Sequence, residues 1–169
     1  MGFVKSATAA VEKQTGEHVE LVYVGSRPGA WGALITSEVA GGAADLSSSP
    51  LTPFFTARRA SVHRADGSRA ALPTSFLVTV TAGNVYLHKH KEFWGRVTLK
   101  KELATFPRTR LRVAAVDRKI TRRFALYIPD PRQFVIFEAY RKHELTDRFT
   151  DMLGATLVGS PAELLTALD

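Results

Sequence analysis

A hydrophobic periodicity of two residues across residues 75–140 constrains the fold of this chain more than any other feature. Short runs alternate apolar and polar residues, and turn residues interrupt them about every 8 to 12 positions. In the run 75–81, Phe76, Val78 and Val80 fall on one face. These intervals are too short for the crossover helices of a parallel sheet. The pattern therefore predicts a mainly β, α+β fold, with an antiparallel barrel or sandwich at its centre.

The periodicity and the turn residues together predict strands over 18–24, 54–63, 75–81, 85–91, 96–106, 110–116, 120–128 and 134–140. An Ala-rich helix is expected over 3–14, ended by a left-handed Gly16. Residues 25–53 are rich in Gly, Ser and Pro and predict a linker with a short helix over 31–40. We therefore expect an N-terminal segment, 1–53, and a β domain, 54–169.

After residue 140 the hydrophobic period changes from 2 to 3.6. Leu145, Phe149, Met152 and Leu153 are spaced i, i+4, i+7 and i+8, which predicts an amphipathic helix. Its apolar stripe needs an apolar surface, and the expected surface is the open end of the barrel, which the helix would close. A second short helix is expected from Ser160, which begins a Ser-Pro-Ala-Glu capping box.

Composition excludes several classes of protein. The 169 residues contain no cysteine, which rules out disulfides, thiolate zinc sites and thiol catalysis. The N-terminus lacks the basic and apolar regions of a secretory signal, and no 18-residue apolar run is present. We expect a cytoplasmic protein without a transmembrane segment, with peripheral membrane attachment left open.

Positive charge is concentrated in the strand-rich part of the chain. The formal net charge is +7, and residues 88–148 hold 16 Lys and Arg against 7 Asp and Glu. A localised positive field attracts anions such as phosphate groups, nucleic acid and acidic lipid headgroups. An anionic partner is therefore expected, although Lys and Arg also serve simply as a solvated surface.

Four segments resemble bacterial pleckstrin-homology-like domains of the uncharacterised actinobacterial type: 72–81, 83–87, Phe106-Pro107-Arg108 and the helix 145–153. The resemblance covers about residues 58–153. It implies an antiparallel barrel closed by a C-terminal helix, and for eukaryotic relatives a basic first loop that binds phosphoinositides. Here the corresponding turn, 82–84, has no basic residue. The charge follows it, on Lys89, Lys91, Arg96, Lys100 and Lys101.

Six side chains are predicted to bind anions: Arg110, Arg112, Arg122, Arg123, Lys89 and Lys91. The guanidinium group matches the geometry of phosphates and carboxylates. In strand periodicity Arg110 and Arg112 share a face, which favours a joint site. The competing interpretation is cross-strand pairing of these arginines with Asp117, Glu102 or Glu138.

Other chemistry has weaker support. His88 and His90 are spaced i, i+2 on a predicted strand and could share a metal, but no further ligand follows from spacing and the adjacent lysines repel cations. Phosphate-cradling, dinucleotide-binding and nucleophile-elbow motifs are absent from the sequence. No cofactor, metal or catalytic residue is predicted.

The sequence thus favours a non-enzymatic binding module that presents a basic face to an anionic partner. That partner would be a membrane surface or a protein segment added along a sheet edge. The first alternative is a nucleic-acid-binding protein that uses Arg110, Arg112, Arg122 and Arg123, and the second is a small enzyme without a recognisable motif. Ligand identity and oligomeric state do not follow from the sequence.

Overall fold

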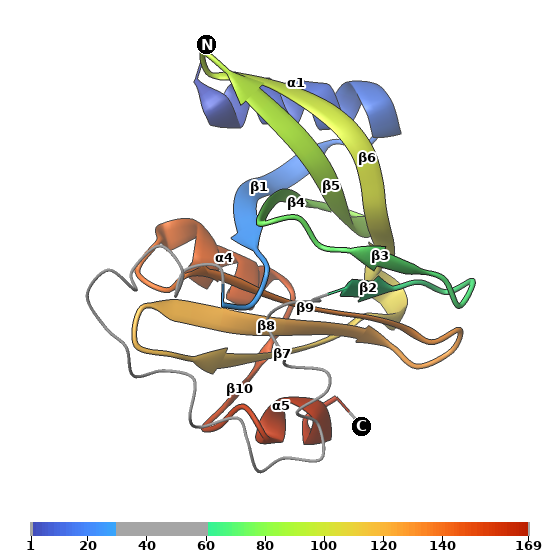
Figure 1. Cartoon of the computed structure of the whole chain (residues 1–169), viewed down its shortest axis with the longest axis vertical. Helices are drawn as coiled ribbons and strands as arrows, with labels where there is room; N and C mark the ends of the chain where they lie inside the picture. The colour runs from blue at the N-terminus through green and yellow to red at the C-terminus, as the bar shows by residue number, and fades with distance from the viewer. Residues whose placement is uncertain (1, 30–60, 169) are drawn as a thin grey trace.

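A computed structural model describes residues 2–29 and 61–168 of the chain (Figure 1). Several predictions fall outside the described residues. They are the helix 31–40, most of the linker, the first part of the strand 54–63 and the domain boundary at residues 53 and 54. Among the described residues, no helix combines the length and hydrophobicity needed to cross a membrane.

The helices and strands follow the predicted order closely. They are α1 (Phe3–Thr15), β1 (Val19–Ser26), β2 (Ser61–His63), β3 (Arg69–Ala71), β4 (Ser75–Thr81), β5 (Asn84–Phe93), β6 (Arg96–Pro107), a 3-10 turn (Arg108–Arg110), β7 (Arg112–Asp117), β8 (Thr121–Ile128), β9 (Gln133–Tyr140), α4 (Glu144–Met152), β10 (Thr156–Val158) and α5 (Glu163–Thr166). The mainly β, α+β character is confirmed.

The strands form one mixed sheet that does not close. Its hydrogen-bonded path among the described residues is β10-β7-β8-β9-β1-β4-β5-β6, with β2 pairing to β3 and β9. One half of the sheet contains β10, β7, β8 and β9, and the other contains β1, β4, β5 and β6. The two halves meet at a single β1–β9 register pair, Ser26 with Glu138. Barrel closure is therefore not confirmed. A purely antiparallel sheet is also wrong, because β10 pairs in parallel with β7.

The main core lies between the two halves of the sheet and is completed by α4. Phe76, Val78 and Val80 of β4 belong to it, as the alternation predicted. Phe149 of α4 is fully buried, and its ring centre lies 5.0 Å from those of Tyr23 and Phe124. The predicted apolar stripe of the helix thus packs into the sheet.

Two smaller apolar clusters cover the outer faces of the sheet. Ala7 and Val11 of α1 pack with Val22, Leu77 and Val97, so that α1 lies across β1, β4 and β6. On the other half, Leu164 and Leu168 at the C-terminus pack on Ala114, Ala125 and Ile136. The predicted stop of α1 is confirmed, since Gly16 adopts φ +73° and its N–H bonds to the Glu12 carbonyl.

Three local expectations need correction. Alternation in the predicted strand 18–24 places Val19, Leu21 and Tyr23 on one face. Val19 does not share that face, because a bulge between Val19 and Leu21 shifts the register of β1. Gly25 and Ser26 belong to β1 and not to a linker. Arg110 lies in the 3-10 turn Arg108–Arg110, so the following strand begins only at Arg112. The physical reason is that Pro107 ends β6 and the chain needs a tight turn before it can pair again.

Candidate functional site

The β5–β6 hairpin (Asn84–Pro107) extends beyond the layer formed by β7, β8 and β9 (Figure 1). At its base, Val85, Leu87 and Phe106 point into the main core. Because side chains alternate along a strand, the same face continues along β5 through Lys89, Lys91 and Phe93. These outer positions are exposed, because the opposite half of the sheet does not reach them. The hairpin therefore turns from a core element into a projecting ribbon.

The other face of the ribbon is covered by α1. Val97 is buried against the helix, and its N–H donates to the Ser6 Oγ at 2.8 Å. The ring of His90 lies 6.0 Å from that of Phe3. Among the described residues, the opposite face of the outer hairpin has no such cover.

Charge is segregated between these two faces. The exposed face carries five cations and no acidic residue, and we call it the basic hairpin face: Lys89, Lys91, Arg96, Lys100 and Lys101. Lys91 pairs with Thr98 and Arg96 with Phe93, which places them on the same side. The two acids of the segment, Glu92 and Glu102, pair with Val97 and His88 and so belong to the α1 side.

A bulge concentrates this charge further. The register moves from His88–Glu102 to His90–Leu99, so that β6 has one extra residue opposite Lys89. That extra residue sets both Lys100 and Lys101 against Lys89. Within the described part of the chain, none of the five cations has a hydrogen bond or an ion pair to a protein group. Like charges in cross-strand neighbours destabilise a sheet, so the arrangement has a cost in folding free energy.

The turn of the hairpin exposes two aromatic side chains. Phe93 is 75% and Trp94 is 87% exposed, the largest exposures among the large hydrophobic residues described. Their ring centres are 6.2 Å apart in an edge-to-face arrangement. Trp94 has φ +52° and Gly95 φ +71°, the combination of a type I′ turn, in which Asn is the preferred residue at the position of Trp94. A bulky side chain is therefore held there against its backbone preference.

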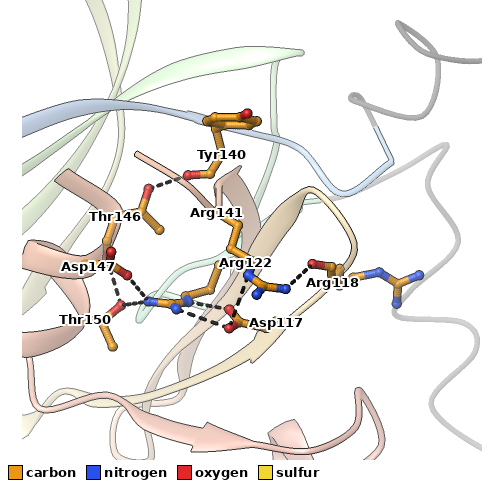
Figure 2. A network of polar contacts seen from close by, with 8 residues as sticks. All are labelled: Asp117, Arg118, Arg122, Tyr140, Arg141, Thr146, Asp147 and Thr150. Carbon is orange, nitrogen blue, oxygen red and sulfur yellow. Dashed lines mark hydrogen bonds and ion pairs between the residues drawn. The ribbon is translucent and has the colours of Figure 1, made fainter. Parts of the chain in front are cut away.

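Arg122 does not lie on this surface but takes part in a network of polar contacts with Asp117, Asp147 and Thr150 (Figure 2). The Arg122 side chain is 9% exposed, and its guanidinium contacts Asp117 at 2.6 Å and Asp147 at 2.9 Å and also donates to the Thr150 Oγ1 at 2.9 Å. Asp117 belongs to β7, whereas Asp147 and Thr150 belong to α4. Arg122 therefore connects α4 to the sheet. Arg141 adds a contact of 3.5 Å to Asp117.

Arg123 is also internal. Its Nη2 lies 2.5 Å from the Glu138 Oε1, and each of the two side chains is 5% exposed. The pair follows from the register, since Arg123 faces Glu138 across β8 and β9. The cross-strand interpretation is thus confirmed for Asp117 and Glu138. Arg122 and Arg123 are corrected from anion-binding candidates to internal ion pairs, because burial and a carboxylate partner remove them from the surface.

The predicted joint site of Arg110 and Arg112 is not formed as a strand face. Arg110 donates to the Asp130 carbonyl at 3.1 Å from its 3-10 turn, and Arg112 donates to the Leu168 carbonyl at 2.6 Å. Of the six predicted anion-binding residues, Lys89 and Lys91 are the two that the structure brings together. The nucleic-acid alternative depended on the four arginines, and the structure does not gather them on one surface.

His88 and His90 do share a face, as the strand spacing predicted, but that face is the one under α1. His88 is fully buried, and its Nε2 lies 3.4 Å from the Gln14 Nε2. Among the described residues, no group of three His, Cys, Asp or Glu side chains could hold a metal ion. Burial lowers the pKa of both histidines below the ordinary 6.5, and for His88 this outweighs the opposite effect of Glu102.

This shift predicts a pH-dependent stability. Between the lowered pKa and 6.5 the unfolded chain binds more protons than the folded chain, so stability is complete above pH 6.5 and falls as the pH decreases. The slope should approach about 1.4 kcal/mol per pH unit for each histidine involved. Urea unfolding of wild type and His88→Gln from pH 7.5 to 5 tests this. A smaller slope is expected for the variant, and the same slope would contradict the assignment.

The edge of β6 is partly occupied by side chains. Besides the bond from Val97 to Ser6, the Arg64 Nε donates to the Leu103 carbonyl at 2.8 Å. A partner strand added along this edge would have to displace these contacts. Binding of a protein segment as an extra strand along this edge therefore has less support than binding through the face of the hairpin.

Sequence reasoning did not single out the Phe93-Trp94 pair. The available signal was Gly95 directly after two aromatic residues, in the gap between two predicted strands. Such a gap is a surface turn, so large aromatic residues in it have no core to fill.

No protein-family model, curated protein or solved structure matches this chain. The pleckstrin-homology-like resemblance therefore stays a prediction that is carried by the residues quoted for it.

Proposed function

We propose that this protein is a non-enzymatic binding module that presents the basic hairpin face to an anionic partner. The observation that carries the proposal is the segregation of charge on β5 and β6, with five exposed cations on one face and the two acids on the other. An electrostatic surface of this kind raises the local concentration of an anionic partner and speeds its association.

Two features support this function over a merely solvated surface. First, the five cations make no ion pair with protein groups in the described residues, whereas Arg122 and Arg123 do. Second, the bulge places three lysines beside one another at an energetic cost. Local arrangements that reduce stability without a folding benefit are concentrated at functional sites.

Retention on heparin-agarose tests the proposal without assuming a particular partner. In one variant the basic hairpin face is neutralised by K89Q, K91Q, R96Q, K100Q and K101Q. The matched control neutralises five exposed cations elsewhere: K13Q, R69Q, K119Q, R132Q and K142Q. Both variants lose five of the positive charges that give the chain its net +7. The hairpin variant should elute at clearly lower salt than the control, since clustered charges act together over a Debye length of about 10 Å.

The outcomes separate the alternatives. Equal elution of the two variants would mean that only net charge matters, and the proposal would fail. The hairpin variant is also expected to keep or raise its unfolding midpoint, because removal of the facing lysines relieves repulsion. A loss of retention with an unchanged midpoint therefore reports on binding and not on misfolding.

A further inference from the structure

We propose that the anionic partner is a lipid bilayer and that Phe93 and Trp94 insert into its interfacial region while the basic hairpin face contacts acidic headgroups. This inference rests on the proposed function and names the partner of the same site. It combines three observations: two exposed aromatic side chains, five cations directly behind them that make no ion pair with a described residue, and a projecting hairpin that carries both.

The order of these groups along the hairpin matches the layers of a membrane surface. The aromatic pair occupies the outermost turn, Arg96 lies at its edge, and Lys89, Lys91, Lys100 and Lys101 follow further back along the two strands. An approaching hairpin would thus place its rings at the boundary between headgroups and acyl chains, with its ammonium groups level with the phosphates. Aromatic residues are enriched at this depth, and each nearby Lys or Arg adds to the attraction to an acidic surface.

The first turn of α1 lies at the same end of the molecule (Figure 1). Ser6 binds the Val97 N–H and Phe3 packs on His90, so the start of the helix is fixed beside the outer hairpin. Val4 on this turn is 50% exposed, and Lys5 beside it is also exposed. This turn adds further apolar and basic groups at the end that would face the membrane.

The shape of the tip favours a bilayer over a folded protein or a nucleic acid. A stable protein interface buries about 800 Å² on each partner, and two side chains on a convex turn do not supply that area. Stacking of successive bases needs aromatic faces side by side, whereas Phe93 and Trp94 are inclined at 78°. A bilayer interface needs neither a complementary pocket nor parallel rings, because it deforms around the inserted groups.

The strained turn strengthens the inference. Trp94 adopts a positive φ that Asn would accept more readily, and it does so with its ring in solvent. Neither the backbone nor the core gains from a tryptophan here. Residues held against such preferences cluster at functional sites.

Trp94 also supplies the probe. The chain has two tryptophans, Trp31 and Trp94, so the variant Trp31→Phe leaves Trp94 as the single reporter. The full chain is mixed with vesicles of phosphatidylglycerol and phosphatidylcholine, with vesicles of phosphatidylcholine alone, and with a single-stranded oligonucleotide. We expect a blue shift of Trp94 emission and quenching by brominated acyl chains with the acidic vesicles only.

Trp94→Asn, in the otherwise wild-type chain, separates insertion from folding. The Asn-Gly turn should keep or raise the unfolding midpoint, while affinity for the acidic vesicles in co-sedimentation should fall about tenfold or more. Phe93→Ser should act in the same direction. Val24→Ser, at an exposed apolar position outside the hairpin, is the matched control and should bind as wild type does.

Binding to acidic vesicles without a blue shift, or unchanged binding of Trp94→Asn, would overturn insertion while leaving the basic-face function in place. Binding of the oligonucleotide with quenching of Trp94, and no vesicle binding, would assign the tip to nucleic acid and overturn the inference. Retention on heparin-agarose without any vesicle binding would also overturn it. Absence of both retention and vesicle binding would overturn the inference and the proposed function together.

Discussion

Replacement of Glu138 by Ala is expected to lower the free energy of unfolding by about 3–5 kcal/mol, because it leaves the guanidinium of Arg123 buried without this counter-charge. The two side chains are each 5% exposed and 2.5 Å apart. Glu138 also accepts a bond from the Gly29 N–H at 3.3 Å, and its backbone carbonyl accepts from the Ser26 Oγ at 3.1 Å. The residue therefore lies where the two halves of the sheet meet.

Asp147→Ala is the matched control for this prediction. Asp147 also pairs with a buried arginine, Arg122, but its side chain is 64% exposed and Asp117 remains as a second partner. Its removal should cost less than about 1 kcal/mol, as for other exposed ion pairs. Urea unfolding of both variants at pH 7 gives the comparison. Similar effects for Glu138→Ala and Asp147→Ala would mean that the internal position of the Arg123–Glu138 pair is wrong.

Phe149→Ala is the second large effect, again about 3–5 kcal/mol, because it opens a cavity in the main core. The Phe149 ring is fully buried and packs against Tyr23, Phe124 and Phe137 at centre distances of 5.0, 5.0 and 6.0 Å. This single side chain is the main apolar link between α4 and both halves of the sheet.

The same unfolding experiment with Leu157→Ala provides the comparison for a large apolar residue near the C-terminus. Leu157 is 56% exposed, so its truncation should change stability by less than about 1 kcal/mol. If Phe149→Ala lowered the free energy of unfolding as little as Leu157→Ala, α4 would not complete the core, and the described packing of α4 would be contradicted.

Local patterns were sufficient to predict most elements. The strand Ser75–Thr81 was predicted with its observed bounds, because one of its faces is continuously buried and bounded by turn residues. The helix containing Phe149 was predicted for the corresponding reason at a period of 3.6. In both cases the signal is contained in a short stretch of sequence.

Long-range pairing could not be predicted in the same way. The strand Thr156–Val158 has three residues and is stabilised by parallel pairing with β7, about 40 positions earlier in the chain. Its short apolar run carries no distinctive period. Closure of the sheet likewise depends on how β1 meets β9, and a single register pair, Ser26 with Glu138, decides it.

In the candidate site, too, the features set by local sequence were predicted and those set by long-range pairing were not. Lys89 and Lys91 were predicted from the positive charge that follows the turn 82–84, which a local stretch of sequence contains. Whether Arg122 and Arg123 lie inside or outside depends on which acids the register places opposite them. Burial of an arginine is tolerated only with such a partner, and sequence periodicity does not identify the partner.

Hydrogen–deuterium exchange of the full chain, with and without phosphatidylglycerol-containing vesicles, shows whether the basic hairpin face is the surface that binds the acidic membrane. We expect slowed exchange to be concentrated in the outer hairpin, residues 89–101, and in the first turn of α1, while β7, β8 and β9 exchange as in the free protein. Protection confined to the β7–β9 half, or distributed evenly over the chain, would show that the partner binds elsewhere and that the basic hairpin face is not the binding surface.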